Sequence, residues 1–503
     1  MTTTSFRTGR TLRLLERVGN RLPHPFYLFL IVAALVVVGS AIAWAFGATA
    51  IDPSSGERVP VRSLLSAEGL AYMVTSAIPN FVAFPPLGLI LTVMLGIGLA
   101  ERVGLMEALM RRSVASAPPR LTTFVIVVVC LLSNLASDSA LLVLPPLAAA
   151  AFLAAGRHPL AGFATAYTAV AAGFSANVVI AGTDVLMSGI STQAARIVDP
   201  DLHVSPLANW FFMSASTLVL AVVITVVCHL VVEPRLGHYV GAVADAPPEP
   251  ITAEQRRGLR RSGVVAAVFV TVLALAVVVP GSPLRGEDGD LLRSPFLEGL
   301  PLFILLFFVA VAIAYGRGAG TLSSWGEVPV TMAGPVRDLA PFIVVIFAAA
   351  QAIAYFNWTG IGLVVATGGA ELLETLHLDG IWGLLLFSIL VAVPALVIGS
   401  GSALWALIAP IAIPMFAVTG IDPAYVQAGF RLTDSATNPL VPMNPMLPVM
   451  LGMIQRYQPR AGLGTFFSLV LPFTLAVWGT WLLLFLVWGL LGLPVGPGHG
   501  LLL

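Results

Sequence analysis

Four ionisable residues lie deep in apolar stretches of the sequence: Asp138, Asp184, Arg431 and Asp434. A charge at bilayer depth costs roughly 2.5–3.5 kcal/mol on insertion scales, so such residues usually serve a function. Arg431 and Asp434 are three positions apart, which places them on one helix face where they can form an ion pair. Either this pair only holds a broken helix together, or Arg431 meets a substrate carboxylate while Asp434 binds a coupling cation or a proton.

The other two aspartates each have two roles open to them. Asp138 lies where a helix is expected to start, so it either caps that helix or contributes to an ion site. Asp184 lies near the outer end of its predicted span if that span is one straight helix. If the chain is unwound over 175–182, Asp184 lies deeper and can belong to the ion site.

One motif occurs twice in the chain. Residues 137–147 read SDSALLVLPPL and residues 400–410 read SGSALWALIAP, aligned without a gap. Each copy is followed by AGF and a polar stretch, from Ala172 and from Ala428. Matched polar breaks in two apolar halves are typical of secondary transporters with internal repeats, whose binding site lies between the repeats. Unwound backbone is tolerated at membrane depth only where protein or a water-filled cavity surrounds it.

Hydroxyl and amide side chains cluster at both copies of the motif. Such oxygens can coordinate sodium at broken helices, or they can simply satisfy backbone groups that the breaks leave unpaired. Two matched clusters favour the first interpretation, with sodium or a proton as the coupling ion. The residues that we expect to form this site, with sodium at the hairpin tips, are Asp434, Asp184, Asp138, Asn134, Ser139, Asn177 and Asn438.

Trp405 follows Ser402 by three residues, so both are expected on the same face of one helix. An aromatic ring beside a hydroxyl suits stacking on a planar ligand ring, and packing in the core explains it equally well. The first copy of the motif has Leu142 at this position. The two copies are therefore not equivalent, and the second is the expected substrate site.

The composition predicts a polytopic membrane protein. The chain has 503 residues, of which 58% are hydrophobic and 10% charged, with a mean hydropathy of +0.96, whereas soluble domains carry about 25% charged residues. The formal net charge of zero gives no reason to expect nucleic acid as a partner. No HExxH or Walker-type motif occurs, so we expect neither an enzyme nor a cofactor. The first apolar run, Phe26–Ala48, is expected to be a span and not a cleaved signal peptide.

Apolar runs of about 20 residues can cross a bilayer as helices. Two further segments, 121–155 and 380–418, consist of two short apolar halves around a polar break, which predicts re-entrant helical hairpins. The fold class is therefore an all-α polytopic membrane protein with nine transmembrane helices and two opposed hairpins. The nine spans lie near 26–48, 84–101, 159–181, 207–232, 263–281, 299–316, 338–358, 424–454 and 464–491.

Arginine placement orients these spans. With the N-terminus inside, nineteen arginines lie on the cytoplasmic side and five outside, which fits the positive-inside rule. The two hairpins then enter from opposite sides, so two inverted repeats are predicted, 84–232 and 338–491. The remaining segments are a cytoplasmic N-terminal segment (1–25), the first span with an outer loop (26–83), a cytoplasmic loop with scaffold spans (233–337) and a C-terminal tail (492–503).

These motifs resemble the AbgT family of p-aminobenzoyl-glutamate transporters, within the ion-transporter superfamily. The resemblance covers nearly the whole chain and is most specific at GSGSALWALIAP, RLTDSATNP and NPMLPVM. It implies a homodimer in a bacterial inner membrane that carries p-aminobenzoyl-glutamate or exports sulfonamide-like antimetabolites, driven by sodium or protons. The family's functional positions look matched by Asp184, Ser402, Trp405, Pro423, Arg431, Asp434 and Pro442.

Three other functions remain open at this stage. A dicarboxylate or other anion symporter of the same superfamily would bind ligands without an aromatic ring. A channel would not need two opposed, closed hairpins. An intramembrane hydrolase would need a base near Ser402, for which Asp434 alone is weak evidence.

Overall fold

The computed structural model describes residues 24–51, 58–118, 120–239, 251–286, 289–291, 294–378, 380–442, 444 and 446–503, without the side chains of residues 50–51 and 135–139. These residues are mainly helical, as the apolar composition predicts. The strands among them form a two-stranded antiparallel hairpin, β1 (Thr49–Ile51) and β2 (Arg58–Pro60). The described part begins with α2 (Pro25–Ala45) and continues after β2 with α3 (Ala67–Val82) and α4 (Pro85–Arg102).

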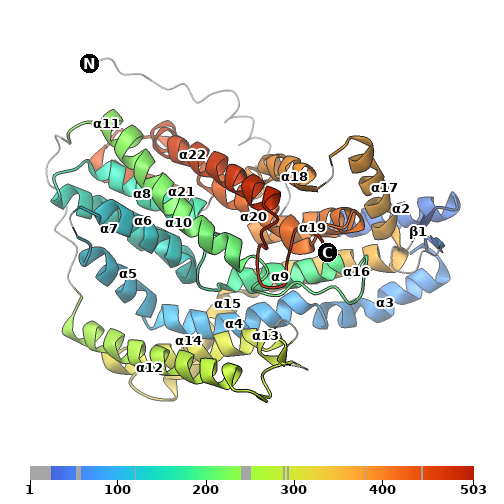
Figure 1. Cartoon of the computed structure of the whole chain (residues 1–503), viewed down its shortest axis with the longest axis horizontal. Helices are drawn as coiled ribbons and strands as arrows, with labels where there is room; N and C mark the ends of the chain where they lie inside the picture. The colour runs from blue at the N-terminus through green and yellow to red at the C-terminus, as the bar shows by residue number, and fades with distance from the viewer. Residues whose placement is uncertain are drawn as a thin grey trace.

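An outer layer of helices packs through glycines. In Figure 1, α12 (Ala253–Val278) and α14 (Leu300–Ala319) lie side by side along one edge of the molecule, next to α4. A Cβ added to Gly318 would come within 2.6 Å of the Cα of Gly258, and one added to Gly96 within 2.8 Å of the carbonyl oxygen of Leu305. Larger residues at these positions would separate the helices. α16 (Ala340–Thr359) packs against α2 elsewhere in this layer.

The first predicted hairpin consists of α6 (Thr122–Leu132), the 3₁₀ turn η1 (Ser133–Ala136) and α7 (Ser137–Ala154). Arg157, just after α7, donates a 2.8 Å hydrogen bond from Nη1 to Oγ1 of Thr123, at the start of α6. The two ends of the segment therefore lie together and its middle forms the tip. Arg157 also binds Glu233, at the C-terminal end of α10 (Trp210–Val227), where a π-helical turn η2 (Cys228–Val232) leads into α11 (Glu233–Leu236).

The second hairpin, α18 (Gly380–Ala395) and α19 (Gly401–Val418), opens at the other end of α10. The rings of Phe387 and Phe416 pack 5.8 Å apart and hold its two arms together. Just after α19, Asp422 donates its backbone N–H to Leu501 in the C-terminal tail. The same tail accepts a bond at Val495 from Phe212, in the first turn of α10. The prediction of two opposed hairpins is thus confirmed in their relative orientation.

Two central helices are interrupted. α8 (Pro159–Ala172) and α9 (Gly182–Ala195) are separated by the irregular segment 173–181. α20 (Pro423–Thr437) is followed by the 3₁₀ turn η4 (Asn438–Leu440) and by α21 (Leu447–Tyr457). The predicted span 424–454 is therefore a broken helix. The predicted span 159–181 covers only α8 and the irregular segment, so α9 lies outside it and was not predicted, and the unwinding considered for 175–182 occurs. The shared AGF sequence is not structurally equivalent, because Gly173 ends α8 whereas Gly429 lies within α20.

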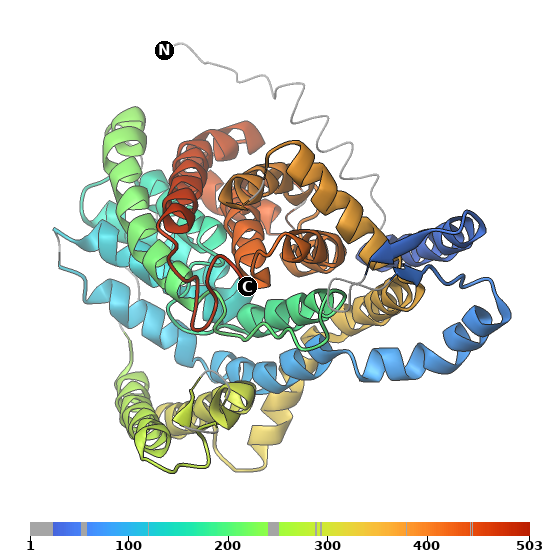
Figure 2. The same cartoon turned by 45° about the vertical axis from the view of Figure 1, so that its right-hand side comes forward.

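The two halves repeat one order of elements. α4, α5 (Leu105–Ala115), the first hairpin, the broken pair α8–α9 and α10 correspond to α16, α17 (Ile361–Thr375), the second hairpin, the broken pair α20–α21 and α22 (Leu463–Leu490). Because the hairpins open at opposite ends of α10, the repeats are inverted. Figure 2 shows the helices of both halves gathered around α20, whose residues are all buried. The exact limits of the repeats remain a prediction.

Within the described residues, eight helices are long and apolar enough to cross a membrane, or nine if the bent pair α17–α18 counts as one span. Seven of them match predicted spans, and the eighth, α19, is an arm of the second hairpin. The short helices α5 and α17, each directly before a hairpin, were not predicted. The remaining short helices are α13 (Pro295–Glu298) and α15 (Glu327–Asp338).

Candidate functional site

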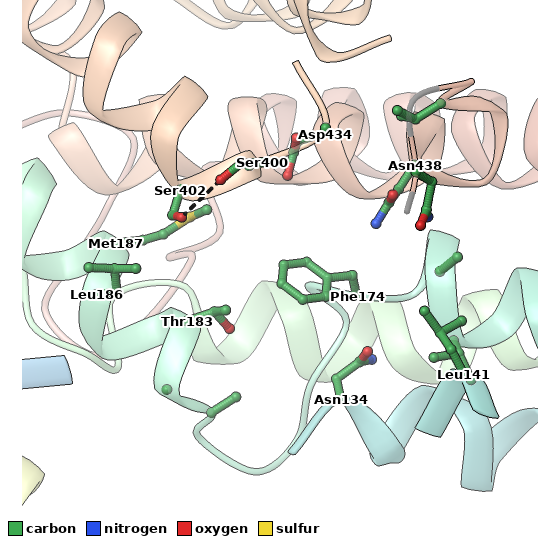
Figure 3. Close-up of a pocket in the computed structure, with 18 of the residues that line it drawn as sticks. Asn134, Leu141, Phe174, Thr183, Leu186, Met187, Ser400, Ser402, Asp434 and Asn438 are labelled. Atoms are coloured by element: carbon green, nitrogen blue, oxygen red, sulfur yellow. Dashed lines mark hydrogen bonds between the residues drawn. The ribbon is translucent and has the colours of Figure 1, made fainter. Parts of the chain in front are cut away.

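A cavity of about 430 Å³ lies where the tips of both hairpins meet the two helix breaks. Figure 3 shows Asn134 and Leu141 of the first hairpin across from Ser400 and Ser402 of the second. α4, α9 and the segment after α20 complete the wall. Its polar groups come from both inverted repeats, as expected for a site between them. The lining residues with polar side chains are Asn134, Thr183, Ser400, Ser402, Asp434, Asn438 and Asn444.

The tip of the second hairpin presents the start of a helix to this cavity. α19 begins at Gly401, and Ser400 caps it by accepting a 3.4 Å bond on Oγ from the N–H of Ala403. The hydroxyls of Ser400 and Ser402 are 3.5 Å apart. Unpaired N–H groups and a partial positive charge at a helix N-terminus favour an anion there.

Asp434 lines the cavity, but Arg431 is not its partner. Arg431 instead extends Nη2 to Oδ1 of Asp184 at 2.5 Å, with both side chains buried. The other oxygen of Asp184 accepts a 2.7 Å bond from the N–H of Ala181, at the start of α9. The expected pairing of Arg431 with Asp434 is therefore wrong, because the guanidinium binds the carboxylate of Asp184, which the start of α9 holds in place.

Arg431 lies behind the cavity wall in this structure. Its Nη1 donates to Oδ1 of Asn209 at 3.5 Å, while Nδ2 of Asn209 donates to the carbonyl oxygen of Ala424 at 2.8 Å. Asn209 thereby joins the start of α10 to α20. Nε of Arg431 is buried without a hydrogen-bond partner. The Nε–H of Arg431 is therefore a buried donor that remains free to bind an acceptor.

Trp405 is also enclosed and does not line the cavity. It has no exposed surface, its ring lies 4.6 Å from that of Phe430, and its Nε1 donates to Oγ of Ser191 at 3.1 Å. Ser402, by contrast, faces the cavity. In this structure Trp405 thus has the packing role that the sequence left open beside ligand stacking.

The two predicted prolines lie at opposite ends of the α20 region. Pro423 is the first residue of α20, where a missing N–H costs nothing, and Asp422 caps this end with a 2.7 Å bond from the N–H of Ala424. Pro442 lies in the break after α20, between Val441 and Asn444, which line the cavity. Neither proline lines the cavity itself.

The predicted ion-site residues are only partly brought together. Asn134 and Asn438 line the cavity with Asp434, and Asn134 donates Nδ2 to the carbonyl oxygens of Leu131 and Gly173 at 2.8 and 3.0 Å. The amide Nδ2 of Asn177 is buried in the break without a hydrogen-bond partner. The side chains of Asp138 and Ser139 lie outside the described residues.

Several residues of the site were not predicted. Thr183 and Asn444 line the cavity, Ser191 holds Trp405, and Asn209 contacts Arg431. Ser191 follows Asp184 by seven residues, two helical turns, so helical periodicity could have placed both on the face that meets the second repeat. Asn209 directly precedes an apolar run, and nothing in its spacing distinguishes it.

Comparisons with known proteins agree along the whole chain. Residues 10–503 match the AbgT putative transporter family. The chain is 42% identical over 495 residues to the p-aminobenzoyl-glutamate transport protein of Escherichia coli strain K12, covering 98% of this chain and 97% of that protein.

Two solved structures are similar. One is the YdaH transporter of Alcanivorax borkumensis, described as having an unusual topology, with a TM-score of 0.90 and 38% identity over 94% of this chain and all of that one. The other is MtrF of Neisseria gonorrhoeae, described as illuminating a class of antimetabolite efflux pumps, with a TM-score of 0.92 and 40% identity over 97% of this chain and all of that one.

Proposed function

Because this chain belongs to the AbgT putative transporter family, we propose that it carries p-aminobenzoyl-glutamate or a related aromatic carboxylate across a bacterial inner membrane, with its N-terminus inside. Its family makes it a multi-pass membrane transporter and not an enzyme. The observation that carries the proposal is the cavity at which both hairpin tips and both helix breaks meet. We further propose that the chain works as a homodimer.

The cavity suits a ligand with an aromatic ring and acidic ends. Its volume of about 430 Å³ is in the range typical of small-molecule sites. Phe174, Leu186 and Met187 provide apolar surface for a ring. The N-terminus of α19, with Ser400 and Ser402, provides donors for a carboxylate.

Arg431 is the proposed partner of a second carboxylate in another conformation of the transporter. In this structure Asp184 occupies its Nη2, so a substrate carboxylate that reaches Arg431 has to replace Asp184. This exchange would link substrate binding to the break between α8 and α9. Trp405, on the arm that carries Ser402, would meet the ring in the same conformation.

Asp434 is the proposed coupling residue. Its carboxylate forms no ion pair with an arginine and lines a cavity that the amides of Asn134 and Asn438 also line. Either a proton on Asp434 or a sodium ion held by these oxygens would neutralise it. Charge neutralisation would then accompany each transport cycle.

Efflux of sulfonamide-like antimetabolites is a second candidate, supported by the similarity to MtrF. The test is gradient-driven flux of labelled p-aminobenzoyl-glutamate and of a sulfonamide in proteoliposomes, with sodium and proton gradients imposed separately. The flux of a labelled dicarboxylate without an aromatic ring is measured in parallel. We expect flux of an aromatic ligand with one of the two gradients, whereas flux of the dicarboxylate alone would contradict the proposal.

Replacing Asp434 by Asn tests the coupling role. Asp434→Asn keeps the shape of the side chain and removes its charge, so we expect gradient-driven flux to be lost while expression is retained. Flux is measured in the same proteoliposomes. Normal gradient-driven flux in this variant would rule the coupling role out.

A further inference from the structure

Gly401 is the first residue of α19 and lines the cavity at the tip of the second hairpin. A Cβ added to this residue would overlap Oδ2 of Asp434 and come within 2.9 Å of its Cγ. The carboxylate of Asp434 thus occupies the space that a side chain at position 401 would need. Because Asp434 belongs to α20, this contact joins the hairpin tip to a helix that is otherwise buried.

The backbone itself does not require glycine at this position. Gly401 is not among the residues with positive φ, and it begins a regular helix. Alanine favours helix formation over glycine by up to about 1 kcal/mol in a helix interior. Gly399, two residues earlier on the same tip, differs, because its added Cβ would meet Cγ1 of Val441 at an ordinary 3.5 Å.

We propose that Gly401 is a positioning residue, which lets the tip of the second hairpin close directly on the carboxylate of Asp434. The carboxylate then faces the first turn of α19, whose N–H groups favour a negative charge. The charge of Asp434 and the position of the tip are thereby linked. Ion or proton binding at Asp434 would loosen the tip. This mechanism deepens the proposed role of Asp434 and rests on it, but the contact itself can be tested without transport.

The first copy of the motif carries Asp138 where the second carries Gly401. The second copy thus has no side chain at this position, and the carboxylate that fills the space comes from another helix, α20. The position of the glycine thus marks the second hairpin as the one whose closure depends on Asp434.

The test uses the full-length protein in detergent and in proteoliposomes, with Met187→Cys as a reporter. Met187 is 1% exposed and lies on α9 beside the tip (Figure 3), and the two native cysteines are buried. We expect Gly401→Ala to lower the melting temperature and to speed maleimide labelling at position 187 roughly tenfold, equivalent to about 1.4 kcal/mol. Gly399→Ala is the matched control and should change neither readout.

A double-mutant cycle with Asp434→Ala separates positioning from simple misfolding. Once the carboxylate is removed, Gly401→Ala should no longer speed labelling, and its melting temperature should equal or exceed that of Asp434→Ala alone. Equal destabilisation by Gly401→Ala in both backgrounds would overturn the proposal, as would labelling indistinguishable from Gly399→Ala. Labelling and melting temperature do not depend on flux. They therefore test the contact even if Asp434→Asn shows normal gradient-driven flux and the coupling role is ruled out.

Discussion

The two hairpins are built on one plan but are fastened differently. The base of the first is held by charge: Arg157 forms bonds of 2.7 and 2.8 Å to the two carboxylate oxygens of Glu233, beside Thr123. The guanidinium also lies 3.7 Å over the ring of Phe152. The base of the second is held by the apolar rings of Phe387 and Phe416. The first base is thus fastened by hydrogen bonds, which depend on direction, and the second by apolar packing, which does not.

The tips of the two hairpins also differ in how they are held. The first is tied by Asn134, which donates to backbone carbonyl groups within its own hairpin and in the break after α8. The tip of the second packs against the carboxylate of Asp434, which is the proposed coupling residue. The first hairpin is therefore fixed by side-chain hydrogen bonds at both ends, whereas the tip of the second packs against a carboxylate that is proposed to gain and lose its charge. We infer that the second hairpin moves more during transport.

The largest effect is expected where the two halves are joined. Asp184→Asn leaves Arg431 buried without a counter-charge, so we expect a loss of about 3–5 kcal/mol in unfolding free energy. The melting temperature in detergent measures it. In the double variant Asp184→Asn, Arg431→Gln, which removes both charges, most of the loss should be recovered. A double variant as unstable as the single one would show that the pair is not what joins the halves.

A smaller effect is expected at the charged base. Arg157→Ala removes bidentate bonds from a carboxylate that is only 20% exposed, which predicts a loss of about 1.5–3 kcal/mol. Because charge contributes to this clamp, the loss should shrink as salt is raised. Thermal unfolding at low and high ionic strength measures both. A loss independent of salt would mean that packing on Phe152, and not charge, fastens the first hairpin.

The smallest effect is expected at the apolar base. Phe416→Leu keeps an apolar side chain but removes three carbon atoms from a buried site, so we expect a loss of about 1–2 kcal/mol, the same at all salt concentrations. The same unfolding experiments test it, with Phe387→Leu as the partner variant. A larger loss here than for Arg157→Ala would reverse the order of the two clamps.

Sequence reasoning located these regions because their signals are local. The repeated motif identified the hairpins, and arginine placement predicted their opposite orientation. The short helices α5 and α17 were missed because each is too short or too polar to resemble a span; Arg111 and Arg112 of α5 were interpreted only as charges that set orientation.

The internal partners of the site were harder to predict. Arg431 and Asp184 are 247 positions apart, and no local spacing connects them. The spacing of Arg431 and Asp434 suggested an ion pair that the break at Asp184 prevents. Gly401 was noted as a mismatch between the copies, but its reason appears only when α20 is placed beside the tip.

The contacts of the first helix break and α9 with α20 set an order on the synthesis and folding of the protein. The N–H of Ser175 bonds to Oγ of Ser435, 260 residues later, and Asp184 must likewise wait for Arg431. At a synthesis rate of about 5–20 residues per second, the first half exists for roughly 12–50 seconds without these partners. During that time an unwound segment and a lone carboxylate need water or a helper protein around them. The rate of translation therefore determines how long the first half waits before these buried polar groups are paired.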